Sequence, residues 1–463
     1  MAPFSANASE RRFADGLIDA RVPRWSSDSR RVELFASRRD PGTGDTVAGT
    51  LHVDVISGAT RWELGDREAG LEDAAAEREA FAAPSIEWTP TEPVHHYVVQ
   101  VDRLFDGVGT DYRRHMDIHV QDGRIVDVVA RGLSPLPAIV IDARDLTIIP
   151  GLIDIHAHQS GLSGERLGRI WLGYGVTTVR EVDSERGDAL ERREAWASGR
   201  RHGPRLLLTA ASPPTIDQNQ RFYDVVELNA NRYPGAPEVA AAAALGIPIF
   251  SDRLLPAARF GINGLEHIGG RSQRPFGLER SLLDRTYHDV TRILSMTRTA
   301  VAPTLAAFGG FSRLAATGSE WSNDAAFSDF YHDYERDAWL KPTDSPERLL
   351  NLQRTVADLV RSGGRVAAGS DAPFVPYGLG LHAELALLSD AGLANDQVLR
   401  LATANAALAL GLERELGTIE VGKRADFVVL RGDPLTRIAD TLQIEATVKA
   451  GEWLTRESLL EAP

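Results

Sequence analysis

The sequence predicts an α/β protein: a (β/α)8 TIM-like barrel with a small β-sandwich domain built from both chain ends. Residues 150–412 alternate short β-runs with Ala-, Leu- and Arg-rich helical stretches, such as the helix expected over residues 396–410. This length is sufficient for eight βα units. Residues 97–149 and 413–463 share a β-rich pattern, which suggests that they form the small domain together.

The first 96 residues are expected to form a strand-rich appendage. Alternating apolar and polar residues predict strands over residues 31–37 and 51–56. Residues 23–30 resemble one blade of a TolB-type propeller, but a single blade cannot close a ring. In the next region, residues 121–124 (QDGR) predict a hairpin turn ahead of a strand.

Composition limits the function classes. The chain has 463 residues, of which 43% are hydrophobic and 25% charged, as expected for a globular protein. A net charge of -14 argues against nucleic acid or an anionic membrane as partner. With no apolar leader and no run near about 18 apolar residues, we expect a soluble, cytoplasmic protein. Since cysteine is absent, His, Asp and Glu are the strong metal ligands that remain.

The first barrel strand is expected to carry a metal-ligand pair. Residues 148–158 (IIPGLIDIHAH) form an apolar run that ends in His156 and His158. Residues i and i+2 of a strand point to the same side, so both imidazoles can reach one ion. The alternative is a half-exposed strand surface without a metal. The Gly turn and apolar run at residues 173–180 complete a βαβ pattern, which favours the metal interpretation.

Two further strand ends carry candidate ligands. His267 ends one βα unit, and Asp371 ends the apolar run of residues 365–371. Asp371 could instead cap the following helix, and His267 could be a hydrogen-bonded core histidine. Catalytic residues of this architecture gather at the carboxyl ends of the strands, which favours the metal interpretation.

Five motifs in order resemble the amidohydrolase superfamily, and most closely its imidazolonepropionase-like and prolidase-like branch, which sometimes carries TolB-type repeats. They are PGLIDIHAH (150–158), GVTTVR (175–180), LEH (265–267), GSDAP (369–373) and GTIEVGKRADF (417–427). The resemblance implies a metal centre in a (β/α)8 barrel. It implies that His156 and His158 are first-strand ligands and His267 the sixth-strand ligand. Asp371 would be the eighth-strand carboxylate and, in a hydrolase, the catalytic base toward a metal-bound water.

The sequence departs from relatives at two ligand positions. Glu227 stands where relatives carry a carbamylated lysine on strand four, and Asp252 where they carry a histidine on strand five. We interpret Glu227 as a catalytic, bridging carboxylate and Asp252 as a metal ligand. The alternatives are a helix-start acid for Glu227 and a salt bridge for Asp252. An oxygen-rich set favours two iron ions, with manganese or zinc as the alternative.

This ligand pattern is similar to that of the amidohydrolase-fold non-haem diiron monooxygenases of platensimycin and platencin biosynthesis. The resemblance implies hydroxylation of a bulky apolar small molecule, such as a diterpenoid acid or thioester, with O2 and an electron donor as partners. The alternative is a metal-dependent amidohydrolase that cleaves an amide or cyclic C–N bond with metal-bound hydroxide. A third alternative is a degenerate barrel that serves as a binding scaffold. A homo-oligomer is possible under each of them.

Further residues are candidates for roles around the ligands. Phe308 and Tyr331 belong to an aromatic-rich segment between strands seven and eight, which forms either an apolar lid over the substrate or a helix packed on the barrel. His382 and Glu384 closely follow Asp371 and are expected to support the metal ligands, since such ligands usually need hydrogen-bond partners.

Overall fold

The protein is described from a computed structural model, in which the chain divides into two compact units, Met1–Thr91 and Glu92–Pro463. The structure describes strands between residues 17 and 64, and residues 96–460 apart from several gaps. These gaps are 138, 160–165, 183–185, 211–222, 229–235, 245, 253–260, 269–287, 298, 319–320, 322–332 and 342–344. Each unit is described by itself.

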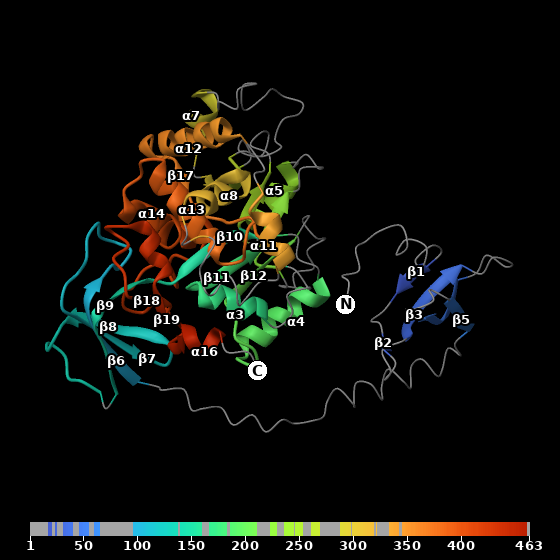
Figure 1. Ribbon diagram of the computed structural model, residues 1–463, viewed down its shortest axis with the longest axis horizontal. Helices are drawn as coiled ribbons and strands as arrows, with labels where there is room; N and C mark the ends of the chain where they lie inside the picture. The colour runs from blue at the N-terminus through green and yellow to red at the C-terminus, as the bar shows by residue number, and fades with distance from the viewer. Residues whose placement is uncertain are drawn as a thin grey trace. The chain divides into compact units, whose positions relative to one another are not determined.

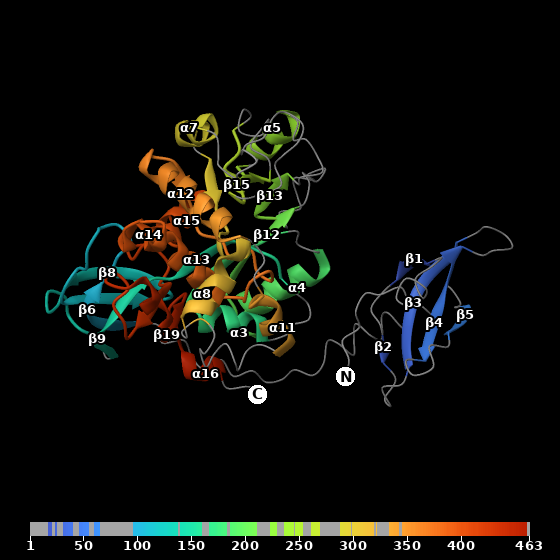
Figure 2. The same cartoon turned by 45° about the horizontal axis from the view of Figure 1, so that its top comes forward.

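The first unit contains an antiparallel sheet of five strands (Figure 2). The strands are β1 (Leu17–Ala20), β2 (Arg24–Trp25), β3 (Arg31–Arg39), β4 (Thr46–Asp54) and β5 (Thr60–Leu64). Their order is β1-β3-β4-β5, and β2 pairs with β3. The strands predicted over residues 31–37 and 51–56 correspond to β3 and β4, although β4 begins earlier in the chain. The relation to a TolB blade stays a prediction.

In the second unit, a seven-stranded sheet combines segments from both ends of the unit (Figure 1). Its order is β20-β19-β18-β9-β6-β7-β8, with every pair antiparallel except β6 and β9. The strands are β6 (His96–Leu104), β7 (Met116–Gln121), β8 (Arg124–Ala130), β9 (Val140–Pro150), β18 (Phe427–Leu430), β19 (Ile444–Lys449) and β20 (Glu452–Thr455). The Tyr97 hydroxyl donates to the Gly451 carbonyl at 2.8 Å, which joins the two chain regions.

The hairpin predicted at residues 121–124 is confirmed, because β7 and β8 pair around it with Gln121 opposite Arg124. Both central residues have positive φ, 49° at Asp122 and 73° at Gly123. This is the geometry of a two-residue turn whose twist matches the flanking strands. A Cβ on Gly123 would lie 2.5 Å from the Ala450 carbonyl oxygen, so the close approach of the chain also requires glycine here.

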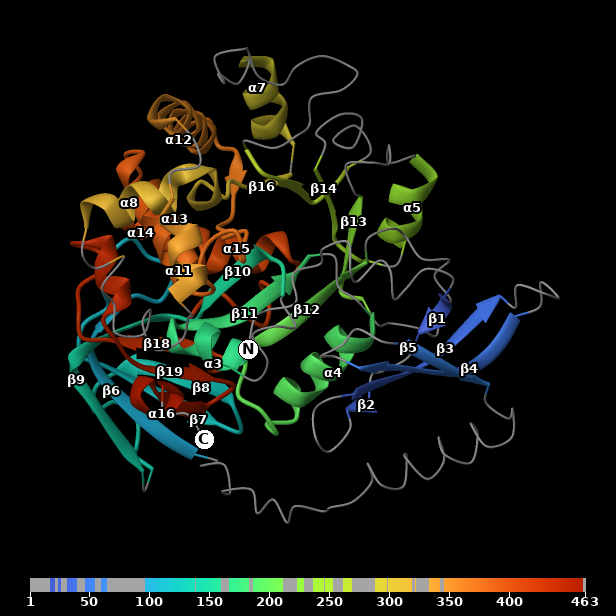
Figure 3. The ribbon, with the colours of Figure 1, turned by 45° about the vertical axis from the view of Figure 1, so that its right-hand side comes forward.

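The other sheet of this unit consists of eight parallel strands in sequence order, and Figure 3 shows β10, β11 and β12 side by side. The strands are β10 (Leu152–Ala157), β11 (Val176–Glu181), β12 (Arg205–Ala210), β13 (Val225–Leu228), β14 (Ile249–Ser251), β15 (Gly264–Glu266), β16 (Ala300–Ala302) and β17 (Arg365–Val366). The segment after β17 returns to β10, since Ile155 donates its N–H to the Ala368 carbonyl and Ala157 bridges Ala372. The predicted α/β fold class is therefore confirmed.

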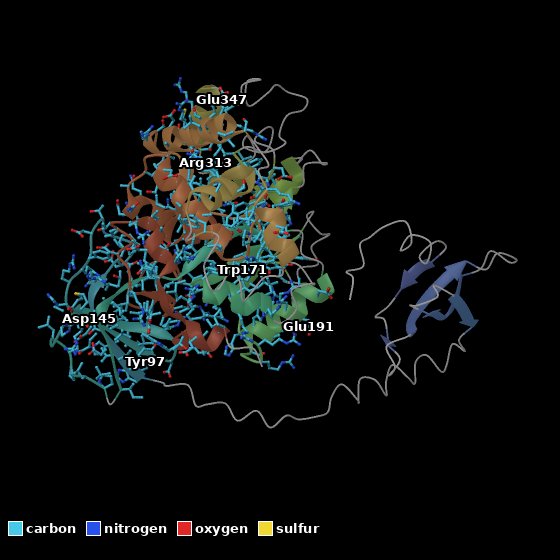
Figure 4. The ribbon with its side chains drawn as sticks, viewed as in Figure 1. Tyr97, Asp145, Trp171, Glu191, Arg313 and Glu347 are labelled. Atoms are coloured by element: carbon cyan, nitrogen blue, oxygen red, sulfur yellow. The ribbon has the colours of Figure 1, made fainter. Side chains whose placement is uncertain are left out.

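Helices alternate with these strands and surround them. They are α3 (Arg166–Gly173), α4 (Arg186–Ala197), α5 (Ala236–Ala244), α7 (His288–Met296), α8 (Phe311–Thr317), α11 (Asp333–Trp339), α12 (Pro346–Arg361), α13 (Leu379–Asp390), α14 (Asn395–Leu401), α15 (Ala404–Ala409) and α16 (Arg456–Leu460). Short helices are the π-helix η2 (Ala306–Gly310) and the 3-10 helix η3 (Ile438–Leu442). Trp171 of α3, labelled in Figure 4, is fully buried, with its ring 5.5 Å from that of Tyr377. Among the described residues, no helix is both long and apolar enough to span a bilayer.

The single helix expected over residues 396–410 is two helices, α14 and α15, because the backbone leaves helical geometry at Thr403. The carbonyls of Leu401 and Ala402 turn away to accept hydrogen bonds from Ala368 and Ile153. These bonds attach the break to the first strand, β10, and to the segment that follows the last strand, β17. The seven-stranded sheet and this parallel sheet belong to one compact unit.

Candidate metal centre

The predicted ligand pair lies at the carboxyl end of β10. His156 is 1% exposed, whereas the side chain of His158, just beyond the strand, is 31% exposed. Their Nε2 atoms lie 3.3 and 3.5 Å from the same oxygen, Oδ1 of Asp371. These three side chains each offer a ligand atom within 4.8 Å of the others. The structure thus brings the first-strand pair together with Asp371, which is far from it in the sequence.

Backbone hydrogen bonds hold Asp371 beside this pair. Asp371 donates its N–H to the His156 carbonyl at 2.8 Å, and His158 donates to the Ala372 carbonyl at 2.6 Å. Asp154, buried on β10, accepts from the N–H groups of His156 and Ser370 at 3.1 and 3.0 Å. The position of the carboxylate therefore follows from parallel pairing between the first strand and the segment after the last one.

Three strand-end residues adopt positive φ. They are His267 after β15, Thr304 after β16 and Asp371 after β17, with φ of 58°, 52° and 62°. Non-glycine residues rarely adopt this conformation, which costs on the order of 1 kcal/mol each and is concentrated at functional sites. Here it occurs at two candidate ligands, His267 and Asp371, and at Thr304, whose hydroxyl lies beside Nδ1 of His267.

His267 lies close to the other ligands, with its ring centroid 4.5 Å from that of His156. Its Nδ1 lies 2.8 Å from the Thr304 hydroxyl, which itself donates to the Pro303 carbonyl. Since a hydroxyl has one hydrogen, Nδ1 of His267 must be the donor to Thr304. This leaves the lone pair on Nε2, whereas Nδ1 lies 3.8 Å from Oδ2 of Asp371. His267 is not among the three residues whose ligand atoms lie within 4.8 Å of one another, so its assignment as a ligand stays a prediction.

His156 is oriented in the same way, by a carboxylate that the sequence analysis did not select. Its Nδ1 lies 2.6 Å from Oε2 of Glu266, so its proton lies on that side and Nε2 faces Asp371. Glu266 in turn accepts from Arg180 at 2.5 Å. Arg180 is fully buried, lies over the Phe250 ring at 4.1 Å and also donates to the Ile155 carbonyl.

The buried charges affect one another strongly. Burial alone would raise the pKa of Glu266, but the Arg180 guanidinium and His156 hold that pKa below its usual range. Burial would lower the pKa of His156, and the charges of Glu266 and Asp371 raise it well above its usual value. Burial would also raise the pKa of Asp371, yet the three neighbouring histidines hold it low. Asp371 is therefore ionised at neutral pH.

Glu227, predicted as a bridging ligand, is 4% exposed on β13, and its Oε2 lies 3.8 Å from the Arg180 guanidinium. Burial, and then the charge of Glu266, raise the pKa of Glu227, and Asp252 contributes in the same direction. Asp252, just after β14, is therefore near Glu227. The assignment of these two carboxylates as metal ligands stays a prediction.

The donor set fits a divalent cation. Nε2 of His156 and Oδ1 of Asp371 are buried and 3.3 Å apart, yet within the described part of the chain neither makes a well-aligned hydrogen bond. Imidazole nitrogens with one carboxylate are ligands of zinc, manganese and iron. Glu266 and Thr304 supply the outer hydrogen bonds that such histidines need.

His382 was expected to support the metal ligands, but its ring nitrogens bind other residues. Its Nδ1 lies 2.8 Å from the Thr441 hydroxyl and its Nε2 2.8 Å from the Tyr174 carbonyl, so both nitrogens are bound elsewhere. It joins α13 to η3 instead. Tyr331 lies outside the described residues. Phe308, by contrast, places its ring 6.0 Å from that of His267.

Glu384 is fully buried on α13 and accepts from the N–H of Ala306 at 2.8 Å, so it holds the start of η2. Burial raises its pKa from 4.5 to about 8, and the charges of Asp154 and Asp371 add to this effect. Its role is thus to support the segment that carries Phe308.

Glu384→Gln should reduce the loss of stability between about pH 5 and about pH 8. In this window the unfolded chain releases the Glu384 proton while the folded protein keeps it, so wild-type stability falls as pH rises. Glutamine cannot ionise and can still accept from Ala306. Urea unfolding at both pH values measures the difference. Glu415→Gln, at a half-exposed ion pair with Arg124, is the control, and parallel pH curves for Glu384→Gln and wild type would contradict the prediction.

Comparison with known proteins supports the resemblance. A family model described as the amidohydrolase family matches residues 320–454. The structure is similar to a putative prolidase from Bifidobacterium longum, with a TM-score of 0.58, 20% identity and coverage of 78% of this chain and 95% of that one. It is also similar to molinate hydrolase, with a TM-score of 0.59, 18% identity and coverage of 80% and 96%.

A curated relative matches a shorter stretch. The chain is 38% identical over 97 residues to 5-methylthioadenosine/S-adenosylhomocysteine deaminase of Moorella thermoacetica, which covers 18% of this chain and 23% of that protein. The chain thus spans about a quarter of the length of this relative. The specific branch of the resemblance, and its diiron oxygenase variant, are not distinguished by these matches.

Proposed function

We propose that this chain is a metal-dependent hydrolase of the amidohydrolase superfamily, because a model of that family matches residues 320–454 and the fold is similar to that of a putative prolidase. Its substrate is a small molecule with an amide or cyclic C–N bond. The observation that carries the proposal is the convergence of His156, His158 and Asp371 at the carboxyl end of the parallel strands. This is where barrel enzymes place their catalytic groups.

In the proposed reaction, His156, His158, His267 and Asp371 would hold a divalent cation. The cation would supply Lewis acidity toward the scissile carbonyl and toward a water molecule. Asp371 is ionised and lies 3.3 Å from Nε2 of His156, so it accepts the proton of the attacking water at Oδ1 or Oδ2 and passes it to the leaving nitrogen. Glu266 keeps His156 oriented throughout.

The matches to known proteins favour this function over oxygenation. The structural relatives named above are a putative prolidase and molinate hydrolase, and the curated relative is a deaminase. The two solved structures share too little sequence identity with this chain, and the deaminase matches too short a stretch, for their substrates to be assigned to it. The main prediction from the sequence, a diiron monooxygenase, depends on Glu227 and Asp252 binding a second ion, and the experiment below tests it as well.

Removal of metal should abolish hydrolysis. We expect the chelator-treated protein to lose its activity on a panel of amides and cyclic imides, because the buried ligand atoms of His156 and Asp371 then have no cation to hold. Zinc, manganese or iron(II) is added back separately without oxygen, and product masses are recorded. A cyclic imide should give one ring-opened product heavier by one molecule of water, and an acyclic amide should give an acid and an amine whose masses together equal those of the substrate and one water.

Two outcomes would contradict the proposal. One is a product that gains a single oxygen atom and forms only with iron, O2 and a reductant, which would support the oxygenase. The other is a metal-loaded protein that turns over no compound of the panel under either condition. A sample with magnesium added back is the matched control, because magnesium prefers oxygen ligands to this histidine-rich set.

A further inference from the structure

Five aromatic rings at the candidate metal centre form a row, in the sense that each ring contacts the next. Their order is Phe374, His158, His156, His267 and Phe308, with successive ring centroids 6.3, 5.5, 4.5 and 6.0 Å apart. Each contact is edge to face. The candidate ligands thus occupy the middle of the row, and a phenyl ring lies at each end.

Phe374 is held in place although its side chain faces solvent. It is 68% exposed, whereas its neighbours Ala372 and Val375 are buried. Its N–H donates to the Asp371 carbonyl at 3.0 Å. The indole N–H of Trp339, from α11, donates to the Pro373 carbonyl at 2.8 Å. The turn that carries Phe374 is therefore attached both to the ligand Asp371 and to a neighbouring helix.

Phe308 is held from the opposite end of the row. Its backbone lies outside helical geometry within η2, next to Gly309 with φ of 81°. Glu384 fixes the start of this segment by accepting from Ala306. The guanidinium of Arg348 lies 5.2 Å from the centre of the Phe308 ring, which adds a cation–π contact. The ring is half-buried beside His267.

We propose that Phe374 and Phe308 are two aromatic walls that bind apolar groups on the two sides of the scissile bond. This inference rests on the proposed hydrolase function and names its substrate class, a neutral amide with an apolar, preferably aromatic, group on both its acyl and amine parts. The reacting bond lies between the walls because the ligands do. A substrate there covers an exposed phenyl ring, which is favourable in water.

Position, and not exposure alone, distinguishes these rings. Single exposed apolar side chains are normal on protein surfaces, and Leu133 and Val421 are exposed by 74% and 63%. Phe374 and Phe308 differ because each ring contacts a candidate metal ligand directly. The backbone beside each ring is also held by a hydrogen bond, from Trp339 to the Pro373 carbonyl and from Ala306 to Glu384, so the backbone loses little conformational entropy when a substrate packs there.

Four amides test the proposal. They combine a small or phenyl-bearing acyl part with a small or phenyl-bearing amine: N-methylacetamide, N-benzylacetamide, N-methyl-phenylacetamide and N-benzyl-phenylacetamide. With the metal-loaded protein, we expect kcat/KM to rise with each phenyl group. Phe374→Ala should lower kcat/KM by about tenfold for one of the two singly substituted amides and leave the other within about twofold. Phe308→Ala should have the same effects with the two amides exchanged.

Phe374→Leu and Phe308→Leu keep apolar volume and should recover part of the loss. Val421→Ala, at an exposed position of the C-terminal region, is the matched control. Metal content is measured for every variant, since a change in it would show an effect on the ligands. Equal hydrolysis of all four amides, or equal losses on all four in both alanine variants, would overturn the aromatic walls while the hydrolase proposal stands. If none of the four amides is hydrolysed, the aromatic walls are overturned too. The hydrolase proposal itself is overturned only if the wider panel of amides and cyclic imides is not hydrolysed.

Discussion

Replacing Asp371 by asparagine is expected to lower kcat for hydrolysis by about 10³-fold or more. Asp371 is the ionised carboxylate of the site, and one of its oxygens lies within 3.5 Å of the Nε2 atoms of both first-strand histidines. Asparagine keeps the shape but cannot accept the proton of the attacking water, and loss of a general base alone costs about 10²–10⁴-fold. The lost negative charge also weakens cation binding.

Steady-state kinetics at saturating metal measures this effect, and metal analysis separates loss of the base from loss of the cation. Asp396→Asn is the control, since Asp396 pairs with Arg400 on α14 at 2.6 Å and belongs to no part of the site. We expect this control to keep its activity. If Asp371→Asn binds metal and retains wild-type kcat, Asp371 is not the catalytic base.

Replacing Glu266 by glutamine should weaken metal binding by about 10–100-fold, as expected when the hydrogen-bond partner of a ligating histidine is lost. Glutamine cannot provide the charge that keeps the Nδ1 proton of His156 on its side, 2.6 Å from Glu266. The change also leaves the fully buried guanidinium of Arg180 without its 2.5 Å partner. Breaking such a buried pair costs about 3–5 kcal/mol of the free energy of unfolding.

Two measurements separate these effects. Competition with a chelator gives the metal affinity, and urea unfolding of the metal-free protein gives the stability. In the double variant Glu266→Gln/Arg180→Met, the unpaired charge is gone, so stability should partly recover while metal affinity stays low. Glu415→Gln, at the half-exposed pair with Arg124, should change neither quantity by much. Unchanged metal affinity in Glu266→Gln would show that Glu266 does not orient His156.

Much of the fold could be predicted because periodic patterns are local. The apolar run that ends at His156 predicted a buried strand, and the QDGR turn predicted the hairpin between β7 and β8. The break between α14 and α15 was not predictable, since residues 396–410 have a continuous helical composition. The break arises from carbonyl contacts to Ile153 and Ala368, which are distant in the sequence.

The barrel pattern and the residues that could bind a cation at its strand ends were readable from the amino-acid sequence. The alternation of strands and helices, the spacing of His156 and His158, and the absence of cysteine are all local properties. Tertiary structure alone decided which polar residues support them. Glu266 and Arg180 stand inside apolar runs and within the motifs LEH and GVTTVR, but nothing local shows that they pair with each other and with His156.

The hydrogen-bond partners of His382 were likewise decided by the tertiary structure. His382 follows Asp371 closely in the sequence, yet its nitrogens bind Thr441 and Tyr174. A hydrogen bond requires atoms about 3 Å apart with aligned geometry, and distances of that size between separate strands are set by packing of the whole barrel. Sequence spacing predicts which face of a strand a residue occupies, whereas the partner across the barrel emerges only when the strands assemble.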